Sequence, residues 1–147
     1  MSVRTATAKD VNWMLDVLEH LWEESPIYKH YTKDRNYVWG ALHAMLCRQD
    51  MIMLVDDAYK AFMIGCVSNQ WYAPDIEAFE MLLAVDKQFR GGMTAVRLIK
   101  EFERECRERN ATAIYVGSSL GIADETAKAL YRKLGFSDYG AGLHKRL

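Results

Sequence analysis

The sequence predicts an α+β fold with one mixed β-sheet and helices on both faces. The chain has 147 residues, a length that suits one domain with a single core. Its apolar patterns follow the order β-α-α-β-β-β-α-β-α-β. Near the middle, an apolar run ends at Val85, a turn with Gly91 and Gly92 follows, and a helical pattern begins. We therefore expect residues 1–147 to form one domain of this class.

The first half of the chain is expected to hold a strand, two helices and two further strands. Thr7 and Asp10 form a capping-box-like pattern ahead of the first helix. Pro26 ends that helix because proline cannot continue one. Thr32 or Asp34 begins the second helix. The strands of this half are expected at residues 3–6, near a sheet edge, and at residues 51–55 and 61–69.

The second half is expected to hold three strands and two helices. Residues 76–85 form the fourth strand, and its last part is almost continuously apolar, which is typical of a central strand. Asp124 is a candidate N-cap for the last helix. One face of the preceding helix carries Val96, Ile99, Phe102 and Cys106 at helical spacing. The remaining elements are expected at residues 92–109 (helix), 112–116 (strand), 124–134 (helix) and 136–147 (a strand that closes the sheet).

The turn after Val85 is the first candidate binding site. A helix that starts after a Gly-containing turn has unpaired backbone N–H groups and the positive end of its dipole at its N-terminus. Such a site suits an anionic group such as a pyrophosphate, with Arg90 adding charge and the glycines allowing close approach. A tight turn with Arg90 in solvent explains the same residues, because one Gly-rich turn is weak evidence by itself. The spacing matches neither a Walker loop nor a dinucleotide fingerprint.

Composition excludes several classes of function. The net charge of −1 argues against a nucleic-acid-binding surface. No apolar run approaches the roughly 20 residues that span a bilayer, and the N-terminus does not resemble a signal peptide. Cys47, Cys66 and Cys106 are odd in number and widely spaced, which indicates reduced thiols in a cytoplasmic protein without a zinc site.

Two motifs resemble the GNAT superfamily of N-acyltransferases. Residues 83–92 read Leu-x-Val-x-x-x-Phe-Arg-Gly-Gly, which is similar to the acyl-CoA-binding segment of that family. Residues 127–136 have an alanine followed by Leu-Tyr-Arg-Lys-Leu-Gly-Phe, which resembles a second family signature. Residues 3–10 look like the first strand and helix entry of the family. Residues 68–80 look like a short subgroup that is common in phages and prophages.

The resemblance implies an acetyl-CoA site. Met93 stands where the family usually has its second loop glycine, Asp124 replaces the usual asparagine, and Lys87 replaces a proline. The residues that would bind the cofactor are Leu83, Ala84, Val85, Arg90, Gly91, Gly92, Met93, Thr94, Ala95 and Asp124.

The resemblance also implies a general acid and a general base. Tyr131 corresponds to the tyrosine that the family places near the cofactor sulfur, although it also lies on an apolar helix face and could simply pack there. Glu80 is the candidate base, because a carboxylate that interrupts an apolar strand needs a partner or a purpose. Glu77 is the alternative, and it faces the opposite side of a regular strand unless a bulge intervenes.

Two functions remain open from the sequence. The first is an acetyl-CoA-dependent N-acetyltransferase that transfers the acetyl group directly, without a metal, to a primary amine of a protein N-terminus, a lysine or a small molecule. Glu23 and Glu24 either attract such an amine or form a solvated helix end. The second is a GNAT-fold binding protein with weak or no catalysis that contacts a partner protein. Neither involves nucleic acid or a membrane, and a homodimer is possible.

Overall fold

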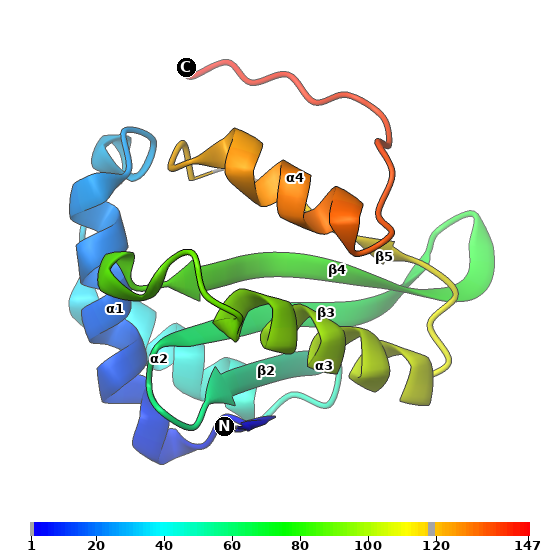
Figure 1. Ribbon diagram of the computed structural model, residues 1–147, viewed down its shortest axis with the longest axis horizontal. Helices are drawn as coiled ribbons and strands as arrows, with labels where there is room; N and C mark the ends of the chain where they lie inside the picture. Colours follow the sequence, from blue (N-terminus) through cyan, green and yellow to red (C-terminus); the bar gives the residue numbers. More distant parts are fainter. Residues whose placement is uncertain (1, 118–119) are drawn as a thin grey trace.

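The computed structural model describes residues 2–117 and 120–147 as an α+β fold with a five-stranded mixed sheet (Figure 1). The strands are β1 (Val3–Thr5), β2 (Met51–Asp56), β3 (Ala61–Gln70), β4 (Ala73–Val85) and β5 (Ile114–Tyr115). The α-helices are α1 (Val11–Glu24), α2 (Arg35–Leu46), α3 (Thr94–Glu108) and α4 (Asp124–Lys133). Short 3-10 turns lie at Ala8–Asp10, Tyr28–His30 and Lys87–Phe89.

The strands lie side by side in the order β1-β2-β3-β4-β5. The first four are antiparallel to their neighbours, and β5 pairs with β4 in parallel after the crossover through α3. The predicted edge position of β1 and the predicted inner position of β4 are both confirmed.

Two apolar layers hold the helices against the sheet. Strand β2 shows the principle, because successive side chains point to opposite faces. Met53 and Val55 pack with α1 and α2, whereas Ile52 and Leu54 pack with α3. Helices α1 and α2 therefore cover one face, and α3 and α4 cover the other (Figure 1).

The predicted capping pattern at the start of α1 is present. The carboxylate of Asp10 accepts the backbone N–H of Thr7 at 2.8 Å, and Thr7 caps the 3-10 turn that leads into the helix. Asp10 is completely buried, and Arg4 donates two hydrogen bonds of 2.8 Å to it. The bond from Arg4 lowers the pKa of Asp10 to about 2, so this buried carboxylate stays charged. Asp34, rather than Thr32, caps α2 by accepting the N–H of Tyr37 at 3.0 Å.

The later helices differ from the sequence expectation at one end or on one face. Leu98 joins Ile99, Phe102 and Cys106 on the buried face of α3, because Leu98 lies four residues before Phe102, whereas Val96 is only half-buried. The helix starts at Thr94 rather than at residue 92. Asp124 is not the N-cap of α4. That position is taken by Ala123, which has a left-handed backbone with φ of 50°, and Asp124 is the first residue of the helix.

The expected last strand is wrong. Residues 136–147 form no strand, and Leu143 and Leu147 are fully exposed. The segment is held instead by side chains: Arg132 pairs with Asp138 at 2.9 Å, and Arg146 donates to the carbonyl of His30 at 2.9 Å. In Figure 1 the segment first passes β5, where the ring centroids of Tyr139 and Tyr115 are 4.8 Å apart, and then runs beyond α4. Among the described residues, none of the helices combines the length and the apolar character that crossing a bilayer requires.

Candidate functional site

The candidate site lies where β4 and β5 separate. Their ladder consists of Ala78 opposite Ile114 and Phe79 opposite Tyr115, and it ends there although β4 continues to Val85. The next residue of β4 is Glu80. Its carboxylate accepts the backbone N–H of Gly117 at 3.3 Å, so a side chain takes the place of the next ladder hydrogen bond. The separation leaves the β5 side of the last part of β4 without a paired strand among the described residues.

A bulge in β4 sets the direction of the side chains around this point. Gly65 of β3 lies opposite Glu80, but the preceding Ile64 lies opposite Leu82, so Met81 is the extra residue. Ala78 therefore packs with the α3 layer and Ala84 with the α1 layer, although both have even numbers. The register is regular from Glu77 to Glu80, so these two carboxylates point to opposite faces.

Glu80 is a carboxylate with an unusual proton affinity. Burial raises its pKa from 4.5 to about 7, and the backbone N–H groups of Gly117 and Leu83 offset only part of this effect. The carboxylate is close enough to Tyr28 and Tyr131 that its charge also raises the pKa of both phenols, whose main perturbation is burial. A group with a pKa near 7 can accept a proton at neutral pH and release it again.

Tyr131 of α4 lies in the same region. Its side chain is 5% exposed, and its ring meets the edge of Phe136 at 5.3 Å. The hydroxyl is buried and has no hydrogen-bond partner among the described residues. A tyrosine that only packs would usually bond its hydroxyl when buried, so the unpaired group requires an explanation.

Glu77, the alternative base, has a different environment. The hydroxyl of Tyr115 donates to its carboxylate at 2.7 Å. Glu77 therefore has a side-chain partner, whereas Glu80 accepts hydrogen bonds from backbone N–H groups, and Glu80 remains the better candidate for a proton acceptor.

The turn between β4 and α3 has the geometry expected of an anion site. Gly91 has φ of 89°, a conformation that glycine adopts without strain. A Cβ at Gly91 or Gly92 would meet no atom within 4 Å, so the space beside the backbone is open. Met93 is the N-cap of α3 and is 58% exposed, so its side chain does not fill this space. The first turn of α3, including Thr94 and Ala95, presents N–H groups without helical acceptors.

Arg90 does not lie free in solvent. It donates to both carboxylate oxygens of Glu24 at 2.6 and 2.7 Å, and its Nε donates to the carbonyl of Val85 at 3.1 Å. The bond from Arg90 lowers the pKa of Glu24, so both groups stay charged. Glu24 is therefore neither an attractor for a free amine nor part of a solvated helix end.

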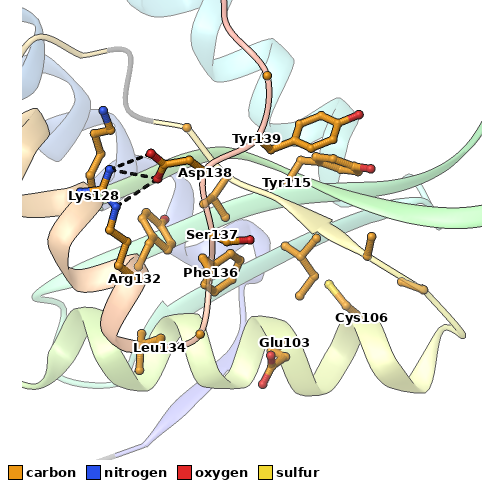
Figure 2. A pocket seen from close by; sticks show the side chains of 18 of the residues that line it. Glu103, Cys106, Tyr115, Lys128, Arg132, Leu134, Phe136, Ser137, Asp138 and Tyr139 are labelled. Carbon is orange, nitrogen blue, oxygen red and sulfur yellow. Dashed lines mark hydrogen bonds and ion pairs between the residues drawn. The ribbon is translucent and has the colours of Figure 1, made fainter.

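A large cavity lies outside this site. It has a volume of about 860 Å³ and lies between α3, β5, α4 and residues 134–140. Figure 2 shows Cys106, Tyr115 and Phe136 around it, with the pair of Arg132 and Asp138 at its rim. The cavity follows the outer edge of β5, where the sequence suggested a further strand. It shares Tyr131 and Asp124 with the candidate site but does not include Glu80 or the turn before α3.

Several site residues were visible in the sequence and others were not. The structure brings Glu80 and Tyr131 together, and it places residues 83–95 on one continuous strand, turn and helix start. Asp124 begins α4, two turns before Tyr131 on the same helix. Sequence reasoning did not single out Tyr28, whose only signal was the aromatic content of the segment after α1. The Glu24–Arg90 pair joins residues 66 positions apart and has no local signal.

The described part of the chain contains no group of three or more His, Cys, Asp or Glu side chains arranged to hold a metal ion.

Comparison with protein families gives a match over most of the chain. The family model described as the acetyltransferase (GNAT) domain matches residues 48–138. This range contains both sequence motifs, Glu80 and Tyr131. No curated protein matches the sequence significantly.

Solved structures with the same fold cover the whole chain. A putative acetyltransferase from Agrobacterium tumefaciens superposes with a TM-score of 0.80 at 17% identity, covering 100% of both chains. An aminoglycoside 6'-N-acetyltransferase from Acinetobacter haemolyticus has a TM-score of 0.75 at 14% identity, covering 100% of this chain and 98% of its own. An aminoglycoside acetyltransferase from an uncultured soil sample has a TM-score of 0.73 at 22% identity, covering 99% and 97%. At these identities the likeness shows the fold alone.

Proposed function

Because the chain belongs to the GNAT acetyltransferase family, we propose that it is an acetyl-CoA-dependent N-acetyltransferase that acetylates a primary amine directly. The observation that carries this proposal is Glu80, a carboxylate with a pKa of about 7 at the point where β4 and β5 separate, beside the buried hydroxyl of Tyr131. A base and an acid at one opening in the sheet are what acyl transfer to an amine requires.

The proposal gives the two side chains complementary roles. A primary amine attacks only as the neutral base, so Glu80 takes its proton at a carboxylate oxygen, either directly or through a water. Tyr131 is protonated at neutral pH, since a phenol has an ordinary pKa of about 10 and burial raises the pKa of Tyr131 further, and its Oη is the proposed proton donor for the leaving sulfur. When bound, acetyl-CoA supplies the acetyl group as a thioester. Neither a covalent enzyme intermediate nor a metal is part of this proposal.

The donor site is proposed along the strand–turn–helix segment. The unpaired side of β4 at Leu83, Ala84 and Val85 offers backbone groups to an extended ligand arm. The turn offers the N–H groups around Gly91 and the dipole of α3 to an anion. The full proposed set is Leu83, Ala84, Val85, Arg90, Gly91, Gly92, Met93, Thr94, Ala95 and Asp124. The open space beside both glycines supports this assignment.

The finer classification is also proposed. We infer a cytoplasmic enzyme of the short phage-type subgroup, on the basis of the cysteine pattern and of residues 68–80. The acceptor is a small molecule or a protein amine, and the enzyme acts as a monomer or a homodimer. Three structural neighbours named as aminoglycoside acetyltransferases make aminoglycosides a sensible first group in an acceptor screen.

The test is an acetyl transfer assay on wild type and Tyr131→Phe. Purified protein is first titrated with acetyl-CoA in a calorimeter, and a panel of aminoglycosides, polyamines and peptides is then assayed by release of free thiol. We expect the wild type to bind acetyl-CoA and to acetylate at least one amine. Tyr131→Phe should bind acetyl-CoA as well as the wild type does, but its turnover should be slower by about 100-fold or more.

A different result would favour the second function. Wild-type protein that is folded but does not bind acetyl-CoA is no acetyltransferase, and a partner-binding role would replace the proposal. If Tyr131→Phe turns over as the wild type does, the hydroxyl is not the acid and Tyr131 only packs.

A further inference from the structure

The ion pair between Glu24 and Arg90 joins two segments that are far apart in the sequence. Glu24 is the last residue of α1, and Arg90 lies in the turn between β4 and α3. The two side chains form a bidentate pair at 2.6 and 2.7 Å, and they are only 26% and 29% exposed. A third bond runs from Arg90 Nε to the carbonyl of Val85 at 3.1 Å.

These bonds use the shape of the guanidinium and not only its charge. An arginine presents five N–H groups in a fixed planar fork, and here three of them are directed at Glu24 and Val85. A lysine is a point charge that cannot make the three bonds together. A carboxylate at the C-terminal end of a helix is disfavoured by the helix dipole, so the position of Glu24 is explained by its partner and not by α1 itself.

Glu24 is in turn anchored by the residue that follows it. The side chain of Ser25 is completely buried, and its hydroxyl donates to the carbonyl of Leu120 in the segment before α4. The same oxygen accepts the backbone N–H of Tyr28 at 3.1 Å. Arg90 is therefore tied to the turn that carries Tyr28, which lies near Glu80.

We propose that Glu24 is a positioning residue of the donor site, and that Arg90 acts as a strut to Glu24 and Val85 rather than as a free cation for the pyrophosphate. The strut fixes the path of residues 86–92 and with it the N–H groups at the start of α3. This inference rests on the proposed function, because it assigns the pair a role in acetyl-CoA binding.

The test is the dissociation constant of CoA, measured by calorimetry for wild type, Glu24→Gln and Arg90→Lys. Glu24→Gln removes the ion pair, and Arg90→Lys keeps the charge but removes the fork. The matched control is Glu23→Gln, which changes the charge of the neighbouring, exposed glutamate by the same amount. We expect each of the first two variants to weaken CoA binding by about fivefold or more, and the control to stay within about twofold. The double variant should bind no more weakly than the weaker single variant, because both substitutions remove the same strut.

Other results would contradict the proposed role of the Glu24–Arg90 pair. If Arg90 is a free cation for the ligand, Arg90→Lys keeps its affinity and Glu24→Gln binds as well as the wild type or better. A change smaller than fivefold in either variant overturns the proposal. Titrations are run below the melting temperature of every variant, so a loss of fold is not mistaken for a loss of binding. A wild type that does not bind CoA contradicts the proposed function, which is a separate result.

Discussion

At the scale of single residues, the site depends on the environment of one carboxylate, that of Glu80, and on the pKa that this environment sets. Glu80 is partly buried without a cationic partner among the described residues, and two backbone N–H groups compensate only part of its desolvation. Asp10 is also buried, but Arg4 lowers its pKa to about 2. The same chain thus keeps the carboxylate of Asp10 charged for structure and holds the pKa of Glu80 near 7, as a general base requires.

The pKa of Glu80 predicts the pH dependence of turnover. The base must be deprotonated, so kcat/KM should rise with pH up to about pH 7 and level off above it. Glu80→Gln should lose activity by about 100-fold or more and lose this dependence. The measurement is a pH–rate profile from pH 5 to 9 with saturating acetyl-CoA. Glu77→Gln is the control, and a profile that changes in this variant instead would make Glu77 the base.

The raised pKa of Glu80 should also make the free energy of unfolding depend on pH. Stability should fall as the pH rises, whereas activity should rise. The folded-state pKa of Glu80 is about 7 and the ordinary value is 4.5, so ionisation disfavours the folded state. The penalty is absent below about pH 4.5 and complete above about pH 7, where it reaches roughly 3 kcal/mol. Glu80→Gln should therefore raise the free energy of unfolding at pH 8 and leave it nearly unchanged at pH 4.5. Urea unfolding at both values tests this, and an equal effect at both would show that burial does not perturb Glu80.

The residues that sequence reasoning found differ from those it missed in how local their signal is. Glu80 stands out because it interrupts an apolar strand, and Tyr131 because it lies within a motif. Tyr28 and Glu24 carry no such signal, since their roles depend on contacts with segments more than 50 positions away. Composition and spacing along one segment do not contain that information.

At the scale of elements, the bulge in β4 links packing to the site. Met81 is inserted opposite the step from Ile64 to Gly65, directly after Glu80. Bulges bend a strand and change where its side chains point. Here the bulge shifts the alternation of side chains after Met81, so Ala84 packs with the α1 layer although Ala78 packs with the α3 layer. A glycine inside β3 could be read from the sequence, but the bulge on the opposite strand could not.

Gly65 should tolerate no side chain. A Cβ at this position would overlap the ring of Phe102 in α3 and lie 2.7 Å from the carbonyl oxygen of Phe79. Gly65→Ala should destabilise the fold by roughly 1–3 kcal/mol or more, because α3 must move away from the sheet. Urea unfolding measures the change, and Gly40→Ala is the control because a Cβ there meets nothing within 4 Å. Equal stability of the Gly65 variant and the wild type would show that α3 packs less closely than described.

At the scale of the whole molecule, the fold was predictable except at its end. The periods of the strands and helices, the strand–turn–helix segment and the parallel crossover all have local signals, and the order up to α4 agrees with the structure. Residues 136–147 contain two glycines and no β-branched residue, so their pattern does not decide between a strand and an irregular segment. An ion pair with α4 and a hydrogen bond to a backbone carbonyl of the segment after α1 hold them instead.

Removal of residues 141–147 tests this arrangement. Their described contacts are the bond from Arg146 to the carbonyl of His30 and the position of its guanidinium 5.3 Å from the ring of Tyr31. Exposed polar contacts of this kind contribute little, so truncation after Gly140 should change the free energy of unfolding by less than about 1 kcal/mol. Urea unfolding with circular dichroism provides the measurement, and Arg146→Ala should reproduce the small effect. A loss of several kcal/mol on truncation, but not in Arg146→Ala, would mean that the segment pairs with the free edge of β5 in solution. The 860 Å³ cavity would then be covered by that strand.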